Sequence, residues 1–157
     1  MKKIGFKIFL LAVIAIIVLF LNFNCNQPSS SGGSSGPSKG RITIRLINAD
    51  VVADGTLCYF GIYNGGADPE IEDYLEGIKG IPINGGLASA TSTTKFPGGK
   101  TYDIYGFVDL DANADPLDPI PDPGDMVTQY PTQYHVFIDG NQTVVINYND
   151  LEEFEEE

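Results

Sequence analysis

The residues best suited to chemistry are six aspartates that lie between positions 109 and 125. Within this segment, side chains that carry oxygen fall at every second position: Asp109, Asp111, Asn113 and Asp115. No Lys or Arg occurs after Lys100, so no basic side chain that is near in sequence offsets the repulsion between these carboxylates. Ca²⁺ takes roughly six to eight oxygen ligands, and alternate side chains of a curled loop can converge on one point. The pattern therefore predicts a cation site.

The predicted ligands of this calcium site are Asp109, Asp111, Asn113, Asp115, Asp122 and Asp125, with Asp118 as a further carboxylate nearby. The spacing resembles the first half of EF-hand calcium loops, but Ala114 stands where such loops have Gly and Ile120 where they have a bidentate Glu. An EF-hand is therefore excluded. The resemblance implies instead a calcium-type loop at a strand end, as in many bacterial extracellular sandwich domains. The alternative is a plain solvated turn, because Asp, Asn and Pro are also turn residues.

The elements that must position this loop have the alternating pattern of β-strands. Alternation places Ile42, Ile44 and Leu46 on one face of the first strand, and Tyr102, Ile104 and Val108 share a face of the strand that leads into the loop. Strands are predicted over residues 41–47, 57–63, 87–94, 101–110, 133–139 and 143–148, with an edge piece at 81–83. Residues 71–79 fit either a short helical turn or a weak strand.

These strands predict an all-β fold, a single antiparallel β-sandwich over residues 41–150. The Asp139-Gly140 turn predicts a hairpin that pairs Val136 and Ile138 with Val144 and Ile146. The pattern resembles prealbumin-like or immunoglobulin-like extracellular modules. Residues 151–157 hold five glutamates, which predicts a frayed acidic tail.

The N-terminus has the composition of an export signal. Lys2, Lys3 and Lys7 precede an apolar run of 14 residues, 8–21, which predicts a signal peptide over residues 1–24. The alternative is an uncleaved transmembrane helix, but such a helix needs about 20 apolar residues.

The sequence that follows predicts a membrane anchor. Leu21-Asn22-Phe23-Asn24-Cys25 resembles the lipobox of bacterial lipoproteins, although Asn22 stands where Leu is usual and Asn24 where a small residue is usual. The resemblance implies that Cys25 is acylated and that the chain is held on a membrane of the bacterial cell envelope. Residues 26–40, 12 of which are Ser, Gly or Pro, predict a flexible tether. The alternative is a secreted protein in which Cys25 is incidental.

Composition argues against two function classes. The net charge is −12, and clustered basic residues of the kind that bind nucleic acid are absent from the sequence. The single histidine, His135, is expected to face solvent, and the sequence contains no Gly-x-Ser-x-Gly elbow. Cys58 lies in a strand-like run and is expected to be buried and inert. We therefore predict a protein that is not an enzyme.

The sequence as a whole predicts a cell-envelope lipoprotein with a calcium-stabilised β-sandwich, used for display or interaction with a protein or glycan partner. The alternative function is a calcium-dependent carbohydrate-binding module or adhesin. Its stacking surface would come from the tyrosines at positions 59, 63, 102, 105, 130 and 134. The absence of Trp counts against this alternative, and tyrosines in strands also serve cross-strand packing.

Overall fold

The computed structural model describes residues 35–155. The predicted signal peptide, the predicted lipidation site Cys25 and most of the predicted tether lie outside the described residues. Within residues 35–155, no helix has the length and apolar character needed to cross a membrane.

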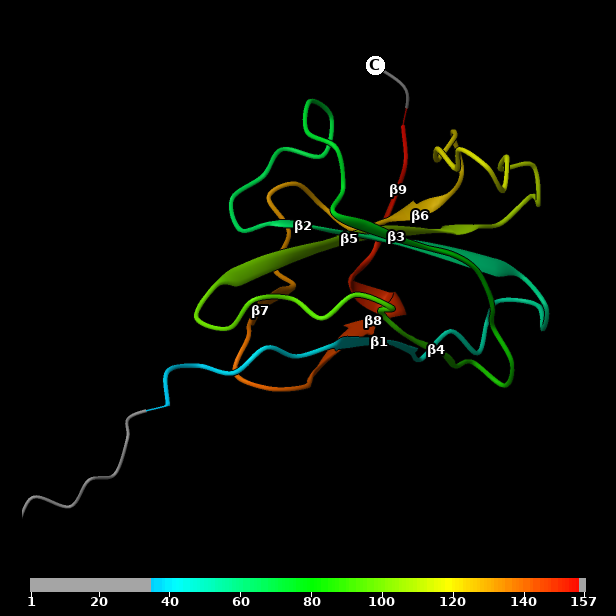
Figure 1. Cartoon of the computed structure of the whole chain (residues 1–157). Coiled ribbons are helices and arrows are strands. Elements are labelled where there is room, and N and C mark those ends of the chain that lie inside the picture. The colour runs from blue at the N-terminus through cyan, green and yellow to red at the C-terminus, as the bar shows by residue number, and fades with distance from the viewer. Residues whose placement is uncertain (1–34, 156–157) are drawn as a thin grey trace, which may run out of the picture. The chain divides into compact units, whose positions relative to one another are not determined.

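The described chain is built from nine β-strands and one short 3-10 helix, arranged as two sheets (Figure 1). One sheet has the strand order β4-β1-β8, and the other has the order β3-β2-β5-β6-β9, with β7 also paired to β5. The all-β sandwich predicted from the sequence is confirmed. All strand pairs are antiparallel except β1 with β8, which run parallel. The elements are β1 Ile42–Ile47, β2 Leu57–Asn64, β3 Glu76–Pro82, β4 Ala88–Thr91, β5 Thr101–Asp109, β6 Met126–Val127, β7 His135–Phe137, β8 Gln142–Asn147, η1 Tyr148–Asp150 and β9 Glu152–Glu153.

The core lies between the two sheets and follows the alternation of the strands. Ile42, Ile44 and Leu46 of β1 are fully buried, and they share one apolar cluster with Ile62 of β2 and Ile104 of β5. Their removal from water is the main favourable contribution to folding, at about 25 cal/mol per Å² of apolar surface.

β5 is the central strand of the larger sheet and is buried on both faces. Its inner face carries Tyr102, Ile104 and Val108, as predicted, and its outer face carries Tyr105 and Phe107, which are also buried. Loops cover this outer face: the Tyr105 hydroxyl donates to the carbonyl of Ala67 and accepts from the amide of Thr132. Figure 1 shows the loops before β3 and after β5 on this side of the sheet.

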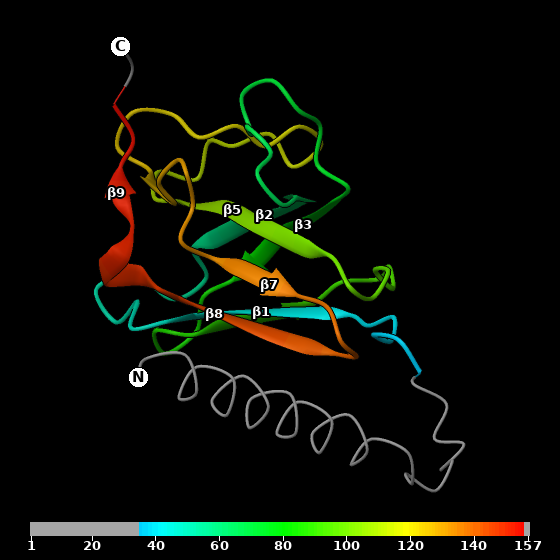
Figure 2. The same cartoon turned by 90° about the vertical axis from the view of Figure 1, so that its left-hand side faces the viewer.

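The predicted hairpin between residues 133–139 and 143–148 is wrong. β7 pairs with β5 and β8 pairs with β1, so the turn at Gly140 crosses from one sheet to the other (Figure 2). Ile138 holds the first segment on the larger sheet, because its amide donates to Lys100 and its carbonyl accepts from Gly99. Val136 and Val144 both belong to the apolar cluster between the sheets.

The predicted frayed tail is also wrong for residues 151–154. Glu152 and Glu153 form β9 on β6, and Leu151 is buried in the core. Phe154 exchanges backbone hydrogen bonds with Gly124 and Asp125. The folded unit therefore extends past residue 150.

The middle segment is divided between a loop and an edge strand. Residues 71–75 belong to the loop, and β3 begins at Glu76. β3 is the edge of its sheet and ends at Pro82, the position expected for a proline that cannot donate to a ladder.

Candidate metal centre

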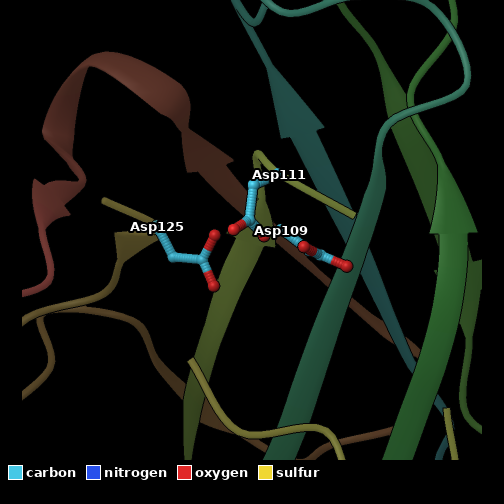
Figure 3. Close-up of side chains that lie close together, drawn as sticks. All are labelled: Asp109, Asp111 and Asp125. Atoms are coloured by element: carbon cyan, nitrogen blue, oxygen red, sulfur yellow. The ribbon is translucent and has the colours of Figure 1, made fainter. Parts of the chain in front are cut away.

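Strand pairing brings the first and last aspartates of the acidic loop together. Asp109 is the last residue of β5, and Asp125 directly precedes β6. The antiparallel register pairs Val108 with Met126, so Asp109 and Asp125 lie side by side where the two strands part. With Asp111 they form a cluster whose candidate ligand oxygens all lie within 4.8 Å of one another (Figure 3).

Two of the three carboxylates are buried and curl the loop by accepting backbone hydrogen bonds. Asp125 is 1% exposed and accepts from the amides of Leu110 at 2.9 Å and Asp122 at 3.2 Å. Asp109 is 2% exposed and accepts from the amides of Asn113 at 3.1 Å and Ala114 at 3.3 Å. The chain therefore turns back around its own carboxylates, as a cation-binding loop must.

Asn113 and Asp122 complete the surroundings of the cluster. The Asn113 side-chain amide donates to Asp111 Oδ2 at 2.8 Å and also to Asp122 Oδ2. The other oxygen, Asp122 Oδ1, is buried and has no hydrogen-bond partner within residues 35–155. A buried carboxylate oxygen without a donor is costly, and a cation is one group that satisfies it.

The other two aspartates of the loop lie outside this cluster. Asp115 Oδ1 accepts from the amide of Leu117 at 2.8 Å, which makes a local turn. The backbone amide of Asp118 donates to the carbonyl of Asp115, and its side chain is exposed. The structure thus gathers Asp109, Asp111 and Asp125, places Asn113 and Asp122 beside them, and leaves Asp115 and Asp118 apart.

The cluster concentrates negative charge, and Lys79 Nζ, which reaches the loop, donates to the Leu117 carbonyl and not to a carboxylate. Burial raises the pKa of the Asp125 carboxyl, and the Asp122 and Asp109 carboxylates add to this effect, which outweighs the hydrogen bonds from the Leu110 and Asp122 amides. Among the described residues no Lys or Arg side chain is within ion-pair distance of any carboxylate. A divalent cation would remove this repulsion and hold the carboxylates ionised.

Tyr59 is a neighbour of the cluster that the sequence did not reveal. Its hydroxyl is buried without a hydrogen-bond partner in the described part of the chain. Burial raises the pKa of Tyr59 first, and the Asp109 carboxylate raises it further. β2 and β5 bring the two residues close, because Leu57 pairs with Asp109 and Tyr59 with Phe107. This proximity depends on strand register, so the sequence carried no local signal of it.

Two further reactive groups lie elsewhere in the sandwich. His135 is half-exposed, as expected, but its Nδ1 also lies 2.6 Å from Asp103 Oδ1. Asp103 is buried, and its other oxygen accepts from the Gly66 amide at 2.7 Å. Cys58 is fully buried, as predicted, and burial raises the pKa of its thiol to about 12.

The arrangement supplies hard oxygen donors at a rigid strand end, which is the chemistry of sites for Ca²⁺ or Mg²⁺. The cluster can therefore hold a metal ion. Its carboxylates alone do not determine which metal binds. Comparison of the chain with known protein families, with curated proteins and with solved structures finds no match.

Proposed function

We propose that this protein is a non-enzymatic lipoprotein of the bacterial cell envelope whose β-sandwich binds a structural calcium ion and serves display or interaction. The observation that carries the calcium assignment is the convergence of Asp109, Asp111 and Asp125 at the end of β5. Two of these carboxylates are almost fully buried, and ionised carboxylates are rarely buried without a partner.

Calcium fits this cluster better than magnesium. Ca²⁺ accepts an irregular shell of carboxylate and carbonyl oxygens, whereas Mg²⁺ demands near-ideal octahedral geometry and loses water reluctantly. The donors here come from a loop of irregular conformation, in which Ala112 has a φ of 62°. The proposed ligands are Asp109, Asp111 and Asp125, with Asp122 Oδ1 and the Asn113 side-chain oxygen after rotation of its amide.

The anchor and the absence of catalysis rest on the sequence. The basic and apolar N-terminus, Cys25 and the Ser/Gly-rich tether support lipidation. A His-dependent nucleophile system needs a hydroxyl or thiol beside the imidazole. Within residues 35–155, Asp103 is the side chain that contacts the His135 ring, and Cys58 lies in the core.

Thermal unfolding tests the calcium site. A ligand that binds only the folded state adds about 2.7 kcal/mol at a hundredfold excess over its Kd, which for a domain of this size raises the Tm by roughly 10 °C. Asp111→Ala should remove most of the rise, and Asp118→Ala is the matched control in the same loop that should retain it. If Mg²⁺ acts as strongly as Ca²⁺, or the two variants behave alike, the effect is charge screening and the site is absent.

Lipid labelling tests the anchor. Labelled fatty acid should enter the wild-type chain and be lost in Cys25→Ser, with the Cys58→Ser variant as control. Equal labelling of wild type and Cys25→Ser, or no labelling of either, contradicts a lipid on Cys25.

The second candidate function is calcium-dependent carbohydrate binding, and a row of tyrosines supports it. Tyr63 contacts Tyr74 and Tyr105, and Tyr105 contacts Tyr130, with ring centroids 5.3–6.4 Å apart. Tyr74 and Tyr130 are 45% and 58% exposed, as a stacking surface requires, whereas Tyr59 and Tyr102 are buried packing residues.

A glycan array with Ca²⁺ and with chelator tests this function. Tyr130→Ala should lose a calcium-dependent signal that Phe137→Ala, an exposed aromatic on β7, retains.

A further inference from the structure

Four of the six basic residues in residues 35–155 gather at one end of the sandwich. These residues, the basic end, are Lys39, Arg41, Lys95 and Lys100. They come from two segments, 37–41 and 93–100, that backbone hydrogen bonds between Gly40 and Phe96 hold together. Gly98 allows the close approach, because a Cβ there would lie 2.1 Å from the Pro37 carbonyl oxygen. The three lysines are exposed.

Two acids beside the basic end already accept hydrogen bonds. Asp139 accepts from the backbone amide and the hydroxyl of Ser38. Glu76 accepts from the amides of Thr93 and Thr94 and from the Thr93 hydroxyl. These carboxylates face their backbone donors, and the exposed ammonium groups of Lys39, Lys95 and Lys100 form no ion pair within residues 35–155.

The acidic loop of residues 109–125 lies at the opposite end of β5 from Lys100. Lys100 directly precedes β5 and Asp109 is its last residue, so about 30 Å lies between the basic end and the aspartate cluster. Figures 1 and 2 both show the acidic loop and the start of the described chain on opposite sides of the sandwich. The loop before β3, which carries Asp68, Glu70, Glu72 and Asp73, begins near Thr101, because the Gly65 amide donates to the Thr101 carbonyl, and it covers the outer face of the larger sheet.

The chain enters the domain at the basic end. Ser38 donates to Asp139 and its carbonyl accepts from Gly140, so the first described residues are fixed there. Cys25 precedes Ser35 by ten residues, which span at most about 35 Å when fully extended and roughly 17 Å as a flexible coil. A lipid on Cys25 would therefore keep the basic end within reach of the membrane surface.

We propose that the basic end docks on the anionic phospholipid headgroups of the membrane that holds the acylated Cys25, and that the aspartate cluster then faces away from that membrane. This inference rests on the proposed lipid anchor. Basic residues close to a bilayer are attracted by anionic headgroups, and the attraction fades within a Debye length of about 8–10 Å. The acidic loop of residues 109–125, at the other end of β5, is repelled by the same surface, so both effects favour one orientation.

The test uses the full lipidated chain reconstituted in vesicles. A fluorophore is attached to an engineered cysteine, which labels selectively because Cys58 is buried and Cys25 carries the lipid. Thr101→Cys reports on the basic end, and Leu117→Cys is the matched control on the acidic loop, since both positions are exposed. Quenching by a lipid with a nitroxide on its headgroup is measured in phosphatidylcholine vesicles with and without phosphatidylglycerol, and vesicle flotation is recorded in parallel.

The label at Thr101 should be quenched several-fold more strongly when phosphatidylglycerol is present, and the label at Leu117 should be unaffected. The triple variant Lys39→Gln, Lys95→Gln, Lys100→Gln, or 0.5 M salt (roughly a 4 Å Debye length), should abolish the difference. A chain that floats with vesicles but shows no dependence on phosphatidylglycerol or on the lysines overturns the docking alone. A chain that does not float overturns the anchor, and the docking with it.

Discussion

The two ends of β5 are built by different means. At the Lys100 end, three chain segments are joined by backbone hydrogen bonds, between Gly40 and Phe96, between Ser38 and Gly140, and between Gly99 and Ile138. At the Asp109 end, β5 is paired with β2 and β6, and side-chain carboxylates accept the backbone amides of the loop that follows. The Lys100 end is held by backbone hydrogen bonds and needs no ion. Folding of the Asp109 end brings several carboxylates together and so concentrates negative charge.

Two carboxyl groups show what this difference means for stability. Burial raises the pKa of Asp125, so ionising it opposes folding when no cation is present. Burial also raises the pKa of Glu76, but the hydrogen bonds from Thr94 and Thr93 outweigh that effect and the pKa is lowered. An ionised carboxylate therefore stabilises the fold at the Lys100 end and, without a cation, destabilises it at the Asp109 end.

Truncation after Asp150 should have the largest effect, and it should act on the Asp109 end. It removes β9, the buried Leu151 side chain and the bonds of Phe154 to Gly124 and Asp125. Loss of a buried leucine alone costs about 2–5 kcal/mol, so we expect the free energy of unfolding to fall by at least that much, which lowers the urea midpoint. Removal of Glu156 and Glu157 alone is the control and should change nothing. An unchanged midpoint after truncation at 150 would mean that β9 does not contribute to the fold.

The pH dependence of the calcium effect should come next. Without calcium, the raised pKa of Asp125 means that the folded state holds its proton more tightly, so stability falls as pH rises from 3.8 through the folded pKa. With bound calcium the carboxylates are held ionised, and stability should instead rise with pH over the same range. Thermal unfolding at a series of pH values, with Ca²⁺ and with chelator, measures both slopes. Asp125→Asn should flatten the chelator curve, and parallel curves with and without calcium would contradict a cluster of ionised ligands.

Glu76→Gln should have a smaller effect on stability. The pH dependence that it removes has the opposite sign to that of Asp125. Its lowered pKa contributes stability that is present above pH 4.5 and is lost as pH falls through the folded pKa. The variant should cost about 0.5–1.5 kcal/mol near neutral pH and should match the wild type at low pH. Calcium should stabilise Glu76→Gln as much as the wild type, because Glu76 is not part of the aspartate cluster. If Glu76→Gln loses the calcium effect, the two ends are coupled.

Thiol labelling of Cys58 should show the smallest effect of calcium. The thiol is fully buried beneath β3, where its Sγ lies 3.3 Å from the Ile81 carbonyl oxygen, and its pKa is raised to about 12. Labelling in Cys25→Ser should be slow until denaturant unfolds the domain, with or without Ca²⁺. Fast labelling of the native protein would show that the core opens on its own, at the end of β2 that pairs with the Asp109 end of β5.

Patterns within a few residues of sequence predicted those strands and loops that depend mainly on residues close together in the chain. The alternation of Ile42, Ile44 and Leu46 predicted both β1 and its buried face, because one side of a strand against a core must be apolar. The position of the acidic loop at the end of β5 was also predicted, and so was the burial of Cys58. The structure brings together three of the six predicted calcium ligands, Asp109, Asp111 and Asp125. Strand pairing, which the sequence does not show, places Asp125 beside Asp109.

The sequence by itself determined the strands β1, β2, β4, β5, β7 and β8, the inward faces of β1 and β5, the charge of the acidic loop and the basic, apolar N-terminus. Each of these depends on residues a few positions apart. Tertiary structure alone decided the rest. Asp139-Gly140 has the residues of a hairpin turn, yet β7 and β8 join different sheets, because Ile138 is held by Gly99 and Lys100 while Gln142 bonds to Arg41. The glutamates of β9 appeared solvated by composition, but pairing with β6 orders them through backbone bonds that do not depend on side-chain type. Which distant strands pair with each other is set by the packing of the whole core, so it cannot be predicted from any short stretch of the sequence.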